Sequence, residues 1–444
     1  MAENEFELRM KDVTLLSFVT TRDAFGDQEV RVTGINDGCR HLLPWGLEPT
    51  GEGVLRWMQS RALPQNRRFA ETLCASMGIA ASDVTGIYGL SMGLSLNDSY
   101  WTPKANADVR FRDVNLFDNG FSEVLAAVAY AGAWDRSSTI HGMTPELTTS
   151  GALAKAWRVE PDGSRALYKG STPGWVPGEP LSEALAWRVA DVAGMRAVPY
   201  SVSVWDGTAC SVCRDFCTTD VSYVPFGLAS ASKSMLSVLA SASSLGTETM
   251  THVLDMLSLD ALICNNDRHF GNFGLLRHND SDEAVGFSPI FDCGRGFLPM
   301  VRDAELAAWE SQANAMRPAF GGGSFDEMAS RLIGERQQEK LRKLKGLDLA
   351  DAVADCLPVE LRDELTARAR ALQPFFQSRL DTLLAMRPVD PNDLVRAVEL
   401  GRANSTPVQD ETIRFVPGSA HYFRPRPGRG DEGQGRPSRE IPSR

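Results

Sequence analysis

The sequence has no long hydrophobic run and no excess of positive charge. The longest apolar stretch of note, residues 124–134, is Ala-rich and much shorter than the ~20 residues that span a membrane. The formal net charge is −11 and the sequence pI is near 5.2. A general nucleic-acid binder needs a basic footprint, which this balance argues against. The composition therefore predicts no membrane span and no direct contact with nucleic acid.

Two further features bear on the compartment. The first ten residues mix Glu and Asn with few apolar side chains, so we expect no secretory signal and a cytoplasmic location. The eight cysteines are scattered, and the default in a large cytosolic chain is reduced, buried thiols. Cys210, Cys213 and Cys217 lie close together, but no second pair follows at zinc-finger spacing, so packed strand thiols are favoured over a zinc site.

The length of 444 residues predicts two to three units. A strand-rich half precedes a helical half, which indicates an α+β fold with two lobes and a site between them. The end of the chain is Pro-, Arg- and Gly-rich, with too few apolar residues to offset ordering entropy. The predicted units are an N-terminal accessory subdomain (1–105), an antiparallel-sheet N-lobe (106–225), an all-helical C-lobe (226–401) and a disordered tail (402–444).

The N-lobe and C-lobe differ in their predicted elements. Apolar patterning predicts four N-lobe strands at 156–159, 166–169, 198–204 and 210–217, with one helix at 181–193 that Gly194 ends. Pro374 divides an otherwise continuous helical pattern by a kink or a break. The predicted C-lobe helices are 233–242, 248–265, 304–313, 325–334, 339–344, 359–372, 374–386 and 391–400.

Three side chains in the C-lobe carry the chemistry that we predict. The segment 261–276 reads ALICNNDRHFGNFGLL and places Asn272 five residues after Asp267. Asp292 follows a short apolar run in the sequence PIFDCG. Phosphoryl transfer needs a carboxylate that accepts the proton of the attacking hydroxyl and oxygen ligands that hold magnesium. The order D-x-x-x-x-N and then D-x-G predicts a kinase with Asp267 as base and with Asn272 and Asp292 as Mg²⁺ ligands.

The N-lobe supplies candidate contacts to ATP. Lys169 ends a predicted strand and is expected to reach the α- and β-phosphates, with Glu183 as its ion-pair partner. The turn TTSGALAK ends in Lys155, but it lacks the G-x-x-x-x-G-K-[ST] pattern of nucleotide hydrolases. His269 is either a brace of its own loop or a phosphate contact. The candidate ATP-binding residues in that turn are Ser150, Gly151, Ala152 and Lys155.

The junction of the two halves is the expected adenine site. Residues 212–216 and 223–225 connect the lobes, and in a two-lobed kinase the adenine hydrogen-bonds the backbone at this point. Their side chains carry no chemical signature, so this assignment is one of position alone.

The motifs NNDRHFGN and PIFDCG resemble those of the HipA-like serine/threonine kinases, bacterial enzymes often encoded as toxins. Asp267, His269 and Asn272 match the family's D-x-H-x-x-N loop, and Asp292 matches its later metal aspartate. Lys169 matches its nucleotide lysine. The resemblance extends over most of residues 10–390 and is strongest from 145 to 300.

This resemblance implies a protein-kinase-like fold and transfer of the γ-phosphate of ATP to a serine or threonine of a protein substrate. It also implies Mg²⁺ and a small DNA-binding antitoxin as a partner. Some members phosphorylate a serine of their own phosphate loop, and Ser150 is the matching residue. Two alternatives stay open on the residues alone: a small-molecule kinase, and a regulatory binding protein with an idle kinase fold.

Overall fold

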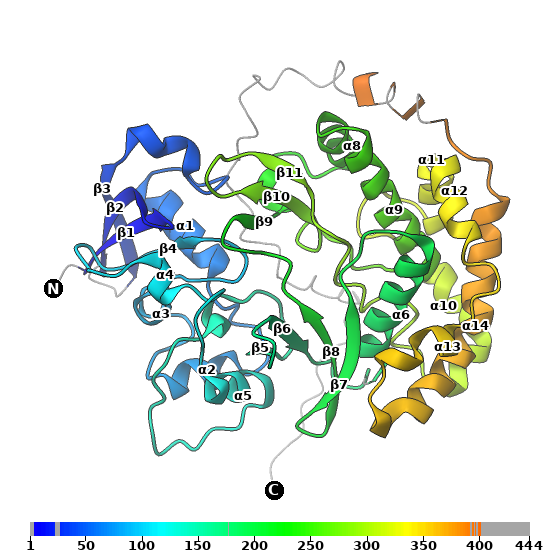
Figure 1. Ribbon diagram of the computed structural model, residues 1–444, viewed down its shortest axis with the longest axis horizontal. Helices are drawn as coiled ribbons and strands as arrows, with labels where there is room; N and C mark the ends of the chain where they lie inside the picture. The colour runs from blue at the N-terminus through cyan, green and yellow to red at the C-terminus, as the bar shows by residue number, and fades with distance from the viewer. Residues whose placement is uncertain are drawn as a thin grey trace, which may run out of the picture.

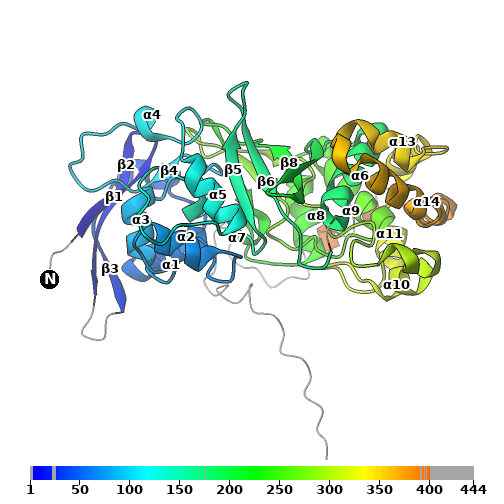
Figure 2. The same cartoon turned by 90° about the horizontal axis from the view of Figure 1, so that it is seen from below.

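The computed structural model describes residues 4–22, 27–175, 177–390, 393–394, 396 and 398–400. The predicted tail, 402–444, lies outside these residues, and so does part of the predicted helix 391–400. In Figures 1 and 2 the N-terminal elements (blue) lie at one end of the molecule and the last helices (yellow to orange) at the other. The elements of the candidate site lie between these two ends.

The N-terminal part is a four-stranded antiparallel sheet with helices packed on it. The strands follow the order β3-β2-β1-β4. Side chains of β1 alternate, with Phe6, Leu8 and Met10 buried, because successive residues of a strand face opposite sides. The elements are β1 (Asn4–Met10), β2 (Val13–Arg22), β3 (Gln28–Ile35), η1 (Asp37–Leu42), α1 (Gly51–Arg61), α2 (Ala70–Ser76), α3 (Val84–Ser91) and β4 (Tyr100–Trp101).

The central part confirms the predicted antiparallel sheet and its single inserted helix. The four strands follow the order β5-β6-β8-β7, and α6 separates β6 from β7 in sequence. Gly194 ends α6 in the left-handed conformation that glycine adopts without cost. The elements are α4 (Phe111–Val114), α5 (Glu123–Ala131), η2 (Pro145–Thr148), β5 (Lys155–Val159), β6 (Arg165–Lys169), α6 (Gly178–Ala193), β7 (Tyr200–Trp205) and β8 (Thr208–Arg214).

The C-terminal half is largely helical, as predicted, but it is not all helix. A sheet of order β11-β10-β9 lies beside the helices, and its strands β10 and β11 fall in the region predicted to be helical throughout. The elements are β9 (Val221–Pro225), α7 (Phe226–Ala229), α8 (Met235–Ser244), α9 (Thr247–Ile263), β10 (Gly274–His278), β11 (Ala284–Phe287), η3 (Asp303–Ala308), α10 (Trp309–Ala315), α11 (Phe325–Leu332), α12 (Glu335–Arg342), α13 (Leu349–Val353), η4 (Ala354–Cys356), η5 (Val359–Leu361) and α14 (Arg362–Ala385).

Pro374 does not divide the last long helix into two. Helix α14 runs for 24 residues with Pro374 inside it. Proline removes one helical hydrogen bond and crowds the preceding turn, a cost of roughly 3 kcal/mol. Leu372, Phe375 and Phe376 are at most 1% exposed, so burial on both sides of the proline offsets that cost.

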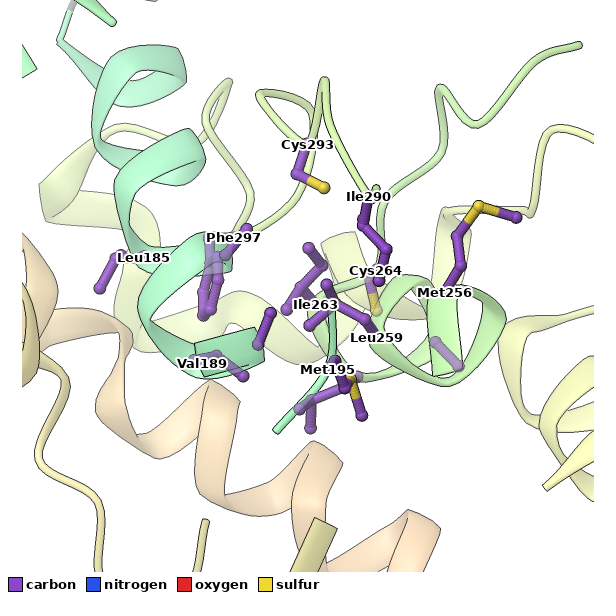
Figure 3. Close-up of a cluster of buried hydrophobic side chains, with 14 of the residues drawn as sticks. Leu185, Val189, Met195, Met256, Leu259, Ile263, Cys264, Ile290, Cys293 and Phe297 are labelled. Atoms are coloured by element: carbon purple, nitrogen blue, oxygen red, sulfur yellow. The ribbon is translucent and has the colours of Figure 1, made fainter. Parts of the chain in front are cut away.

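One buried cluster supports the loops that carry the candidate site. Helices α6 and α9 and the segment after β11 contribute to it, and Figure 3 shows their side chains packed together. Ile290 and Phe297, on either side of Asp292, are at most 3% exposed. The loop around Asp292 is therefore anchored at both ends in a close-packed interior. Within the residues described here, every helix is too short or too polar to cross a lipid bilayer.

Candidate active site

Lys169 connects the two halves of the molecule. It ends β6, and its Nζ donates to Glu183 Oε1 on α6 and to Asp292 Oδ1 at 2.6 Å. Burial alone would lower the pKa of Lys169, but the charges of Asp292 and Glu183 hold it well above its ordinary value. Burial raises the pKa of Glu183, and the positive charge of Lys169 offsets part of that rise. The predicted pair of Lys169 and Glu183 is thus in contact, and Asp292, whose side chain is partly exposed, completes a three-residue network.

Lys155 lies directly opposite Lys169 in the β5–β6 pair, so both side chains project from the same face of the sheet. Its Nζ makes no hydrogen bond or ion pair with any described residue. Burial, followed by repulsion from Lys169 and Arg67, lowers the pKa of Lys155 to about 8. Two buried ammonium groups on neighbouring strands repel each other, and the charge of a polyanion bound beside them would relieve that repulsion.

Gly151 leaves room for the Lys155 side chain. A Cβ at this position would lie 2.3 Å from Lys155 Nζ, and its φ of +92° is one that other residues rarely adopt. Ser150 and Ala152, beside it in the turn, are exposed. The Ser150 hydroxyl makes no hydrogen bond with any described residue. The structure therefore brings Gly151 and Lys155 together, and leaves Ser150 and Ala152 at the outer edge of the turn.

We expect Lys155→Met to stabilise the ligand-free protein and to weaken its binding of ATP. The lowered pKa means that the folded chain releases this proton between about pH 8 and 10.5, while the unfolded chain still holds it. The charged lysine therefore costs stability below about pH 8, and that cost disappears as the pH rises toward 10.5. The gain in the free energy of unfolding at pH 7 is on the order of 1–3 kcal/mol.

Urea unfolding of the wild type and of Lys155→Met at pH 7 and at pH 10.5 measures this gain. Lys169→Met is the matched control on the neighbouring strand, and it should destabilise the protein because it leaves Glu183 buried without its cation. A Lys155→Met protein that is less stable than the wild type at pH 7 contradicts the prediction.

A buried ion pair between Arg67, from the N-terminal part, and Glu146, in η2, holds both ends of the turn 148–155. Arg67 pairs with Glu146 at 2.8 Å, and their side chains are at most 1% exposed. Arg67 also donates to the backbone oxygens of Thr149, at 3.3 Å, and of Lys155. Glu146 in turn accepts the Trp157 N–H at 2.6 Å. The turn is thus fixed to the end of η2 and the start of β5.

The loop after α9 gives Asp267 and Asn272 a defined arrangement. Asn272 Nδ2 donates to the Asp267 backbone oxygen at 2.9 Å, which directs Oδ1 away from the loop. His269 Nδ1 accepts the Gly271 N–H at 3.0 Å, so His269 braces the loop. Burial, and then the charge of Asp292, raises the pKa of Asp267 above its ordinary value. A raised pKa suits a general base, because it increases the affinity of the carboxylate for a proton.

The oxygens of Asn272 and Asp292 fit a magnesium ion. Asn272 Oδ1 accepts no hydrogen bond from any described residue, and the Asp292 side chain is 34% exposed. Amide and carboxylate oxygens are hard ligands, and Mg²⁺ in kinases uses one or two of them together with phosphates and water. When bound, the ion neutralises charge on the phosphates. Among the described residues, this site included, no three His, Cys, Asp or Glu side chains gather as a metal site, so phosphates and water would have to supply the other ligands.

The backbone at Asp292 is in an uncommon conformation. Asp292 has a φ of 54°, whereas Gly294, the glycine of the D-x-G turn, has no positive φ. A non-glycine residue in this region is uncommon and carries strain. Gly294 serves another purpose, because a Cβ there would lie 3.2 Å from Glu183 Oε1. The backbone of the turn is therefore strained at Asp292, the predicted metal ligand, and packs closely against Glu183 at Gly294.

Arg268 ties the two functional loops together and to α9. It is 2% exposed and pairs with Asp260 through two hydrogen bonds of 2.9 and 3.0 Å. It also donates to the backbone oxygen of Asn272 at 2.8 Å and to that of Phe291. The pKa of Arg268 is held well above its ordinary value, because Asp260 outweighs the effect of burial. One side chain thus sets the distance between the loop of Asp267 and the loop of Asp292.

Three aromatic rings occupy the junction where we placed the adenine. Phe216, Tyr223 and Phe291 lie with ring centroids 5.4–5.7 Å apart. The Tyr223 hydroxyl donates to the Gly271 backbone oxygen at 2.9 Å, which links the junction to the catalytic loop. The adenine site itself stays a prediction.

Sequence reasoning missed the roles of Arg67, Glu146, Arg268 and Asp260. Arg67 and Glu146 are 79 residues apart, so no local pattern could join them. Arg268 stands directly after Asp267, but a charged residue in a polar loop gives no sign of burial. The one signal present in the sequence was the position of Arg268 directly after Asp267, the predicted base.

No protein-family model matches the chain. The serine/threonine-protein kinase CtkA of Helicobacter pylori is 26% identical over 139 residues, which are 28% of this chain and 42% of the relative. The chain is similar to a kinase. The aligned part is less than half of CtkA, so the activity, substrate and partners of this chain are treated as proposals.

Two solved structures are similar to the chain at low TM-scores. The H. pylori proinflammatory kinase CtkA has a TM-score of 0.43 and 18% identity, over 56% of this chain and 95% of that chain. HipA of Shewanella oneidensis MR-1, solved with HipB and operator DNA, has a TM-score of 0.49 and 12% identity, over 86% of this chain and 100% of that chain. The sequence similarity to CtkA agrees with the kinase class that the motifs predict.

Proposed function

We propose that this protein is a Mg²⁺- and ATP-dependent kinase that phosphorylates a serine or threonine of a protein. The observation that carries the proposal is the convergence of Lys169, Asp292 and Asp267 from three segments of the chain. Lys169 contacts Asp292, and the charge of Asp292 acts on Asp267. The sequence similarity to a serine/threonine-protein kinase supports the same class of reaction.

Each side chain has a place in the proposed reaction. Lys155 and Lys169 bind the phosphates of ATP, and Glu183 holds Lys169 in place. Asn272 and Asp292 supply the oxygen ligands for Mg²⁺. The acceptor hydroxyl gives its proton to Asp267 as its oxygen bonds to the γ-phosphorus, the bond from that phosphorus to the bridging oxygen breaks, and ADP leaves.

The proposal is tested with purified protein, radiolabelled ATP and Mg²⁺, in two parallel assays. One assay offers a bacterial lysate treated to inactivate its own kinases, and the other offers a panel of small alcohols and amino sugars. Label on protein serine or threonine supports the proposal. Label confined to small molecules would replace it with the small-molecule kinase, and ATP binding without any transfer would replace it with the idle regulatory protein. The antitoxin partner implied by the resemblance stays a prediction.

A further inference from the structure

Arg295, three residues after Asp292, presents a guanidinium that makes no hydrogen bond to a described residue. Its Nε is buried without a partner. The nearest carboxylate, Glu179, lies at 4.0 Å, the outer limit of an ion pair. An arginine has five donors, so this cation has capacity for an oxyanion.

Glu179 makes no hydrogen bond to Arg295, and both of its oxygens accept from Thr172. Its Oε2 accepts the Thr172 N–H at 2.5 Å, and its Oε1 accepts the Thr172 hydroxyl at 3.0 Å. Arg295 is instead held by stacking, with its Cζ 4.2 Å from the centre of the Trp175 ring. A guanidinium stacked in this way keeps its plane fixed and its N–H groups free at the edge.

The position of Arg295 relates it to the proposed chemistry. It follows Gly294, where an added Cβ would lie 3.2 Å from Oε1 of Glu183, the partner of Lys169. The positive charge of Arg295 also lowers the pKa of Asp267, so the two side chains are close enough to interact. Its side chain is 33% exposed, which leaves it accessible to a ligand.

We propose that Arg295 donates hydrogen bonds to the phosphoryl group during its transfer. This inference rests on the proposed kinase function. In the transfer the acceptor oxygen bonds to the γ-phosphorus, the bond to the bridging oxygen of ADP breaks, and the hydroxyl proton moves to Asp267. In the transition state the phosphoryl group lies between the acceptor oxygen and the bridging oxygen of ADP, and its three other oxygens carry negative charge. A fixed guanidinium stabilises that transition state more than it stabilises bound ATP.

The test compares ADP with ADP plus aluminium fluoride, which mimics the phosphoryl group in transfer, by calorimetry in the presence of Mg²⁺. Arg295→Ala should weaken binding of the fluoride complex by about a hundredfold or more and change ADP binding by less than about threefold. Arg295→Lys keeps the charge but loses the planar set of N–H groups, so its affinity for the fluoride complex should lie between those of the wild type and of Arg295→Ala. Arg302→Ala, an exposed arginine seven residues on, is the matched control and should change neither.

The outcomes separate this inference from the proposed function. Millimolar guanidinium should restore part of the binding and of the transfer rate to Arg295→Ala. Equal losses for ADP and for the fluoride complex, or no loss in either, would overturn the role of Arg295. A wild-type protein that binds neither ligand would instead overturn the proposed kinase function.

Discussion

Asp267→Asn should lower the turnover of phosphoryl transfer by about 10²- to 10⁴-fold and leave ATP affinity nearly unchanged. The substitution removes the proton acceptor but keeps the size of the side chain. The backbone oxygen of Asp267 still accepts from Asn272, so the loop should keep its shape. Single-turnover rates with labelled ATP, together with calorimetric ATP binding, measure the two quantities separately.

The same variant should be at least as stable as the wild type at pH 7. Burial raises the pKa of Asp267, so the folded chain holds this proton to a higher pH than the unfolded chain does. The ionised carboxylate therefore costs stability above that pKa, and Asn removes the cost. The exposed Asp280→Asn is the control, and its turnover should equal that of the wild type. Normal turnover of Asp267→Asn would show that another group accepts the proton.

The pH dependence of wild-type turnover gives a second view of Asp267. A base must be ionised to accept a proton, so turnover should fall as the pH is lowered through the raised pKa of Asp267. The fall should begin at a higher pH than an ordinary aspartate would give, because burial and Asp292 both disfavour the charge. The variant Asp267→Asn should lack this dependence.

The sequence predicted those parts of the structure that local order determines. Apolar alternation placed the strands that become β5, β6, β7 and β8, and glycine placed the end of α6. The contact between Lys169 and Glu183, which are 14 residues apart, follows from a strand that leads into a helix. Phosphoryl transfer also needs a fixed set of oxygen ligands, so the order of Asp267, Asn272 and Asp292 along the chain makes them candidates, and their roles stay a prediction.

The rest depends on contacts between distant segments. Strands β10 and β11 are only five and four residues long, and pairing with β9 and with each other forms them in a segment for which we predicted no strand. Burial of Phe375 and Phe376 keeps α14 continuous through Pro374. The brace from Arg67 to Glu146 joins segments that meet only after folding. Tertiary burial decides each of these features, and a single sequence does not display it.

Arg268→Met should lower the free energy of unfolding by about 3–5 kcal/mol, the second large effect that we expect. The substitution leaves the Asp260 carboxyl group 2% exposed with no cation beside it. It also leaves the backbone oxygens of Asn272 and Phe291 without their shared donor. Urea unfolding measures the loss. Turnover per folded molecule is measured without denaturant, at a temperature at which the variant is folded.

A double variant separates the contribution of Arg268 to folding from its contribution to positioning. Asp260→Leu in the Arg268→Met background removes the unpaired charge, so most of the lost stability should return. Turnover should not return, because nothing then fixes the loop of Asn272 relative to the loop of Phe291.

Arg379→Met is the matched control, since Arg379 is buried and donates to the backbone of α9 at Ala261 without reaching either loop. It should lose stability and keep its turnover per folded molecule. Full turnover in the double variant of Arg268 and Asp260 would show that Arg268 serves folding alone, and that the spacing of the two loops is set by the packing beneath them.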